Sequence, residues 1–83
     1  MRDYCISRKG AGYRTRWAVD SDGQRHGEYL SQWAAMLDAV DAAYEDAQRG
    51  TPSRVVLRAT DGTDEICWKP GDPYPYEPPA QET

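Results

Sequence analysis

Apolar residues recur at helical spacing through the middle of the chain. Between residues 31 and 50 they follow offsets of three and four, which is typical of one buried helix face, at Trp33, Met36, Leu37, Val40, Tyr44 and Ala47. Ser31 suits the N-cap, and Gly50 suits the position just after the helix. The pattern predicts a helix over about residues 32–49. Its flank of small residues comprises Ala35, Ala39, Ala42 and Ala43.

Segments with a period of two lie on both sides of this helix. A first strand ends at the Gly10 turn, and in the second the residues expected to face the helix are Tyr13, Thr15, Trp17 and Val19. After the turn at Asp22-Gly23, residues 24–30 are expected to return as a short strand. Beyond the helix, two strands joined at Asp61-Gly62 are expected to place four residues inward, namely Val55, Leu57, Ile66 and Trp68.

These elements predict an α+β fold with a small antiparallel sheet of four to five strands and one helix packed on one face, in the order β-β-(β)-α-β-β. One apolar layer between helix and sheet is expected to hold Trp17, Trp33, Leu37, Val40, Leu57 and Trp68. Residues 1–69 form a single domain in this interpretation. From Pro70 the chain becomes rich in proline, so residues 70–83 are expected to be a flexible tail.

Charge is spread unevenly along the chain. The net charge is −4, yet residues 1–27 carry +3 and residues 28–50 carry −4. Overall acidity disfavours a simple nucleic-acid binder, because phosphate affinity rests on clustered lysine and arginine. We expect a basic hairpin and an acidic helix within one small body.

No stretch of the sequence carries a catalytic, metal-binding or nucleotide-binding signature. His26 is the only histidine and has no acidic or cysteine partner at a suggestive spacing, and the serines lack a nucleophile motif. Cys5 and Cys67 are expected to be reduced structural thiols. We therefore expect no enzyme activity, no catalytic residues, no metal and no cofactor. No run of residues approaches a membrane span or an export signal, so a cytoplasmic location is expected.

Two sets of charged residues are candidate contact sites. Asp38, Asp41 and Glu45 gather on one flank of the predicted helix, where they could meet a basic groove of a protein partner. Alternatively, Arg14, Arg16 and Arg25 could line the open sheet face and contact phosphates. Our main hypothesis is that the chain binds a protein partner, and the alternative is that it binds nucleic acid. The sequence leaves the oligomeric state open.

Three resemblances accompany these patterns. Residues 12–26 followed by a helix look like the three-stranded arm-binding domains of phage-type integrases, which implies DNA binding. Trp17-Ala18-Val19, the Asp-Gly turns, the alanine-rich helix and Val55-Val56-Leu57 resemble a family of small bacterial and phage domains of unassigned function. In size, acidity and layout the chain is also similar to some phage anti-CRISPR proteins, which block a surface of a defence complex. We therefore expect a non-enzymatic protein-binding module, an inhibitor or accessory protein of a phage or mobile element that occupies a basic surface of a partner complex.

Overall fold

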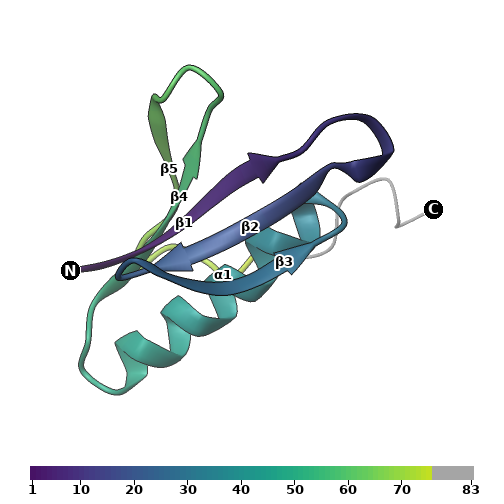
Figure 1. The fold of residues 1–83 in the computed structure, drawn as a ribbon. Helices are drawn as coiled ribbons and strands as arrows, with labels where there is room; N and C mark the ends of the chain where they lie inside the picture. The colour runs from purple at the N-terminus through teal and green to yellow at the C-terminus, as the bar shows by residue number, and fades with distance from the viewer. Residues whose placement is uncertain (76–83) are drawn as a thin grey trace.

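The computed structural model describes residues 1–75 as a five-stranded sheet with one α-helix. The strands are β1 (Arg2–Lys9), β2 (Arg16–Ser21), β3 (Gln24–Tyr29), β4 (Ser53–Arg58) and β5 (Asp64–Trp68). A short 3₁₀ turn, η1 (Gly12–Arg14), joins β1 to β2, and helix α1 (Gln32–Gln48) joins β3 to β4 (Figure 1). The α+β class is confirmed, and so is the layout of one helix on a sheet.

The sheet has the strand order β3-β2-β1-β4-β5, so the N-terminal strand lies at its centre. The pairs β1–β2, β2–β3 and β4–β5 are antiparallel. Strands β1 and β4 are parallel, with Tyr4 opposite Val55. The sheet is therefore mixed rather than wholly antiparallel, because the helix carries the chain across one face before β4 pairs with β1.

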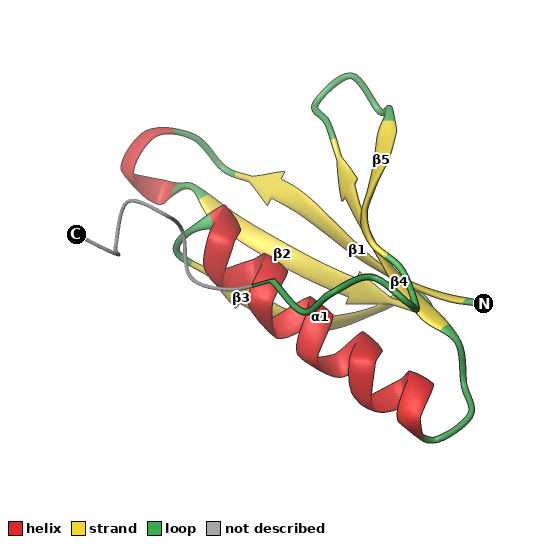
Figure 2. Ribbon diagram, turned by 180° about the vertical axis from the view of Figure 1, so that it is seen from behind, coloured by secondary structure: helices red, strands yellow, loops and turns green. Residues whose placement is uncertain are grey.

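Helix α1 begins where the sequence indicates. The Ser31 hydroxyl accepts a hydrogen bond from the Ala34 amide at 3.1 Å, which satisfies one of the free donors of the first turn. Gly50, with φ of +88°, follows the last turn in the left-handed conformation that a side chain would disfavour. Figure 2 shows the helix lying across one face of the sheet.

The small-residue flank of α1 is the face that packs on the sheet. The buried helix residues are Ala35, Ala39, Val40 and Ala43, and they form one cluster with Tyr4, Ile6, Val19, Val55 and Trp68 of the sheet. Of the six residues expected in the core layer, Trp17, Val40, Leu57 and Trp68 belong to this cluster or pack against it. The prediction was wrong for the other two: among the described residues, Trp33 and Leu37 are half-buried and outside the cluster.

The volumes of the facing side chains explain why the small-residue flank of α1, rather than Trp33 and Leu37, packs on the sheet. The sheet already contributes large side chains to this layer, so the helix approaches closely only with small residues facing inward.

We expect Ala39→Leu to destabilise the fold by about 1–3 kcal/mol, because three extra carbons enter a fully buried site. Thermal unfolding checks this expectation, and Ala34→Leu at an exposed position of the same helix is the matched control. Equal melting temperatures for the two variants would contradict the observed helix orientation.

Two strand predictions need correction. Tyr13 and Thr15 lie before β2 rather than within it, and Tyr13 is 88% exposed instead of facing the helix. In β5, a register shift between Val55 and Val56 leaves Ile66 opposite Val56, where Ile66 is 50% exposed. A bulge of this kind adds one residue to a strand and so breaks the strict alternation that the sequence suggests.

The segment after β5 turns back along the helix (Figure 2). Within it, the Tyr74 hydroxyl donates a hydrogen bond to Asp41 of α1. Residues 70–75 therefore touch the body of the domain, whereas the rest of the expected flexible tail, 76–83, lies outside the described residues. Within residues 1–75, no helix has both the length and the apolar character needed to cross a bilayer.

Candidate interaction surfaces

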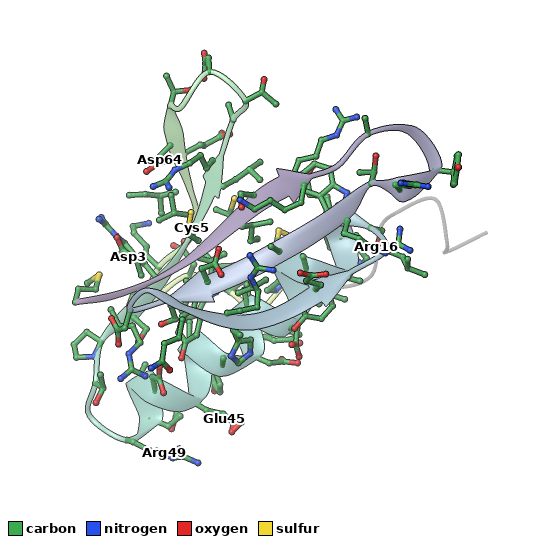
Figure 3. All side chains as sticks on the ribbon, viewed as in Figure 1. Asp3, Cys5, Arg16, Glu45, Arg49 and Asp64 are labelled. Atoms are coloured by element: carbon green, nitrogen blue, oxygen red, sulfur yellow. The ribbon has the colours of Figure 1, made fainter. Side chains whose placement is uncertain are left out.

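The outer side of α1 carries three carboxylates. Asp38, Asp41 and Glu45, which we call the acidic helix face, are three and four residues apart and so lie on one side of the helix. The side chains of Asp38 and Glu45 are 48% and 63% exposed. Figure 3 shows Glu45 and Arg49 at the C-terminal end of the helix, away from the sheet. The structure thus brings the three predicted acidic residues together.

Asp38 also ties the edge strand β3 to the helix. Its carboxylate accepts a hydrogen bond from the Tyr29 hydroxyl and lies 3.6 Å from His26 Nε2. Burial, together with this hydrogen bond to a carboxylate, raises the pKa of Tyr29 to about 12. A side chain at Gly27 would collide with the Tyr29 hydroxyl, so the glycine lets that ring lie across the strand.

The other two carboxylates of the acidic helix face are only weakly neutralised. Asp41 accepts the hydrogen bond from Tyr74, and the pKa of Tyr74 is raised chiefly by that bond. Glu45 lies 3.9 Å from Arg49 in a pair that is mostly exposed. Exposed pairs of this kind contribute at most about 1 kcal/mol, so the face keeps most of its negative charge.

Apolar side chains adjoin the acidic helix face. Trp33 and Leu37 are half-buried, and Tyr44 is 47% exposed while its ring meets Trp68 edge-on with centroids 6.4 Å apart. Tryptophan and tyrosine dominate the energetics of many protein interfaces. The helix therefore offers aromatic contact area beside its carboxylates.

A fourth helix carboxylate points inward, and sequence reasoning missed it. Asp46 Oδ2 accepts hydrogen bonds from Tyr4 at 2.6 Å, from Ser53 at 3.1 Å and from Arg2 at 3.1 Å. The Tyr4 hydroxyl, followed by the Ser53 hydroxyl and the Arg2 charge, lowers the pKa of Asp46. Its spacing of three from Ala43 was the available signal, because it places Asp46 on the small-residue flank.

Arginines on the sheet face away from the helix are paired with carboxylates across neighbouring strands. Arg54 and Arg58 alternate with the inward residues of β4, and they bind Asp3 at 2.7 Å and Asp64 at 2.9 Å. Asp3 and Asp64 are labelled in Figure 3. Each arginine holds its carboxylate through two nitrogens, the geometry of a bidentate pair. These contacts neutralise the charge of the open sheet face.

The structure separates the three arginines that the sequence grouped. Arg25 lies on β3, where it binds Asp20 at 2.7 Å and also pairs with Glu28. Arg14 and Arg16 lie instead at the β1–β2 connection, at the far end of β2 from Asp20. Arg8 and Lys9 lie at the same end, because Lys9 is opposite Arg16 in the register. We call Arg8, Lys9, Arg14 and Arg16 the basic hairpin end.

The two cysteines occupy different strands. Cys5 lies on β1 and Cys67 on β5, with β4 between them in the sheet. Burial is the main cause that raises the pKa of each thiol. Both are therefore more fully protonated at neutral pH than an exposed cysteine.

Residues 1–75 contain neither a detectable pocket nor a group of three or more metal-ligating side chains. None of the protein-family models, curated proteins or solved structures compared with the chain matches it.

Proposed function

We propose that this protein is a non-enzymatic binding module that docks on a basic surface of a protein partner through the acidic helix face. The partner in this proposal is a complex whose basic groove holds nucleic acid, and the module acts as an inhibitor of the phage or mobile-element kind by occupying that groove. It works by stoichiometric binding rather than by chemistry.

The observation that supports the proposal most directly is the charge of the outer helix surface. Asp38, Asp41 and Glu45 project from one face of the helix. Of these three carboxylates, only Glu45 has a lysine or arginine nitrogen of the described chain within 4.0 Å. A negative field from a rigid helix accelerates encounter with a positive groove. The adjoining Trp33, Leu37 and Tyr44 supply area that excludes water once the partner is in place.

The alternative, a nucleic-acid-binding sheet face lined by Arg14, Arg16 and Arg25, has weaker support because these three arginines do not lie together: Arg25 is paired with Asp20 and Glu28, and Arg14 and Arg16 lie at the other end of β2. Arg25, Arg54 and Arg58 are each engaged by carboxylates, so this face offers phosphates little free positive charge.

A matched pair of variants tests the proposal. Asp41→Asn/Glu45→Gln removes two charges from the acidic helix face, and Asp61→Asn/Glu65→Gln removes the same two residue types from the β4–β5 hairpin. Asp38 is left intact because it accepts the Tyr29 hydrogen bond. In affinity capture from the host lysate, the parent and the hairpin variant should retain a common partner, and the helix variant should lose it by about ten-fold in affinity.

Binding to that partner should weaken as salt rises, and nucleic acid should compete with it. Equal retention by the two variants, or equal loss, would argue against the acidic helix face as the docking surface. Circular dichroism of both variants checks that the fold is intact.

A further inference from the structure

The cations without ion pairs gather at one place in the fold. The chain has ten lysine and arginine residues, and six of them form ion pairs with carboxylates: Arg2, Arg25, Arg49, Arg54, Arg58 and Lys69. Within residues 1–75, the four that make none are those of the basic hairpin end, between Arg8 and Arg16. No aspartate or glutamate occurs between Asp3 and Asp20. An acidic protein therefore keeps one concentrated positive surface.

The backbone of this connection holds the cations close together. Lys9 and Arg16 are directly opposite in the β1–β2 register and share the open sheet face, whereas Arg8, opposite Trp17, lies on the helix side of the same end of the hairpin. Gly10, with φ of +77°, turns the chain where any Cβ would meet the Arg14 carbonyl oxygen at 2.7 Å. The η1 turn then presents Arg14, which is exposed. The Arg16 guanidinium is fixed by a hydrogen bond of 2.9 Å to the Thr15 carbonyl.

An aromatic ring stands among these charges. Tyr13 is 88% exposed, the largest exposed fraction among the exposed large hydrophobic residues of the described chain. The Arg14 guanidinium lies over its ring, 5.8 Å from the centroid. An exposed ring on a short, ordered turn loses little further freedom when a flat ligand stacks on it.

We propose that the basic hairpin end binds single-stranded nucleic acid, with phosphates contacting Arg8, Lys9, Arg14 and Arg16 and a base stacking on Tyr13. Cations together with an exposed aromatic are the combination by which proteins hold single strands with little sequence preference. This surface is separate from the acidic helix face, so it does not depend on the function proposed above.

A single strand fits better than a duplex or a membrane. A duplex presents phosphates over a broad surface, and the open sheet face next to this end has its arginines neutralised by its own carboxylates. Stable membrane attachment needs more apolar contact than one tyrosine supplies. A flexible strand can instead follow the small charged end and turn one base onto the ring.

The test is a titration of the full chain against a fluorescent 15-nucleotide mixed-sequence DNA strand at low salt. We expect a Kd on the order of micromolar and an affinity that falls with salt by about 0.7 log units per log unit for each phosphate contact. Arg14→Gln/Arg16→Gln should weaken binding at least about ten-fold and reduce the salt slope by about 1.4. Arg54→Gln/Arg58→Gln changes the net charge equally and should bind like the parent.

Variants of Tyr13 distinguish the contribution of base stacking from that of charge. Tyr13→Ala should lower the affinity about ten-fold without changing the salt slope, and Tyr13→Phe should restore it. Absence of binding at low salt, equal loss in both arginine pairs, or tighter binding to the corresponding duplex or to phosphatidylserine vesicles would overturn the proposal. Melting temperatures near that of the parent would show that each variant is folded.

Discussion

Replacing Trp68 by alanine should cost about 3–5 kcal/mol of stability, the largest loss that we expect from any single truncation in this domain. Trp68 is 3% exposed and closes the core at the β5 edge, where it also meets the ring of Tyr44. Small domains have a total stability on the order of 5–15 kcal/mol, so this loss should remove a large share of the stability and lower the melting temperature markedly. Thermal unfolding followed by circular dichroism measures the effect.

Two control variants make this prediction specific. Trp33→Ala removes the same side chain from a half-buried position outside the core cluster, and it should lower the melting temperature much less. Trp68→Phe keeps most of the ring and removes an indole N–H that has no hydrogen-bond partner within the described chain, so it should also be mild. Similar losses for Trp33→Ala and Trp68→Ala would contradict the core described above.

Asp46→Ala should destabilise the domain by about 1.5–3 kcal/mol, the range for hydrogen bonds to a charged group. The Asp46 carboxylate is the shared acceptor for three donors on two strands, Arg2 and Tyr4 of β1 and Ser53 of β4, and Ser53 is fully buried. Removing the acceptor leaves the hydroxyl of Tyr4, a residue that is 5% exposed, without its hydrogen-bond partner. Arg2 is more exposed and keeps its ion pair with Asp22 at 3.1 Å. Chemical denaturation with a constant m-value would show that stability, rather than compactness, has changed.

The Asp46 carboxylate should also make the stability of the domain depend on pH in the acidic range. Hydrogen bonds from Tyr4 and Ser53 and the charge of Arg2 lower its pKa in the folded state below the ordinary value of 3.8. The contribution of Asp46 to the free energy of unfolding is therefore complete above pH 3.8, and it is lost as the pH falls through the lower pKa of the folded state. Asp46→Asn should flatten this acid limb of the stability curve. The more exposed Asp64→Asn should change it less, and the reverse order would refute the assignment.

Local sequence patterns were sufficient for the elements themselves. The Ser31 cap, the Gly50 stop and the glycine turns indicate the helix and the three hairpins, since each depends on residues close together in the chain. Period-two alternation likewise identified core-facing residues of two strands: Trp17 and Val19 of β2, and Val55 and Leu57 of β4. The acidic helix face also followed from spacing alone, because residues three and four apart share a side of any helix.

Contacts between residues far apart in the chain determine which charged side chains are neutralised and which stay unpaired. Alternation cannot tell which strands become neighbours, so the parallel pairing of β1 with β4 and the cross-strand pairs of Arg54 and Arg58 were not predictable. Those pairs neutralise the open sheet face and leave the basic hairpin end as the positive surface. Asp46 became a shared, half-buried acceptor because β1 and β4 bring Arg2, Tyr4 and Ser53 to the end of the helix.

By itself, the sequence determined that one helix and two groups of strands form, and it located the helix and the turns between the strands. Tertiary structure alone decided which stripe of the helix is buried. Trp33, Leu37 and Tyr44 share one stripe, and Ala35, Ala39 and Ala43 share another at equivalent spacing, so periodicity cannot rank the two. Hydrophobicity favours the larger residues, but a sheet that already presents Tyr4, Ile6 and Trp68 leaves space at close approach only for small side chains, three alanines and Val40.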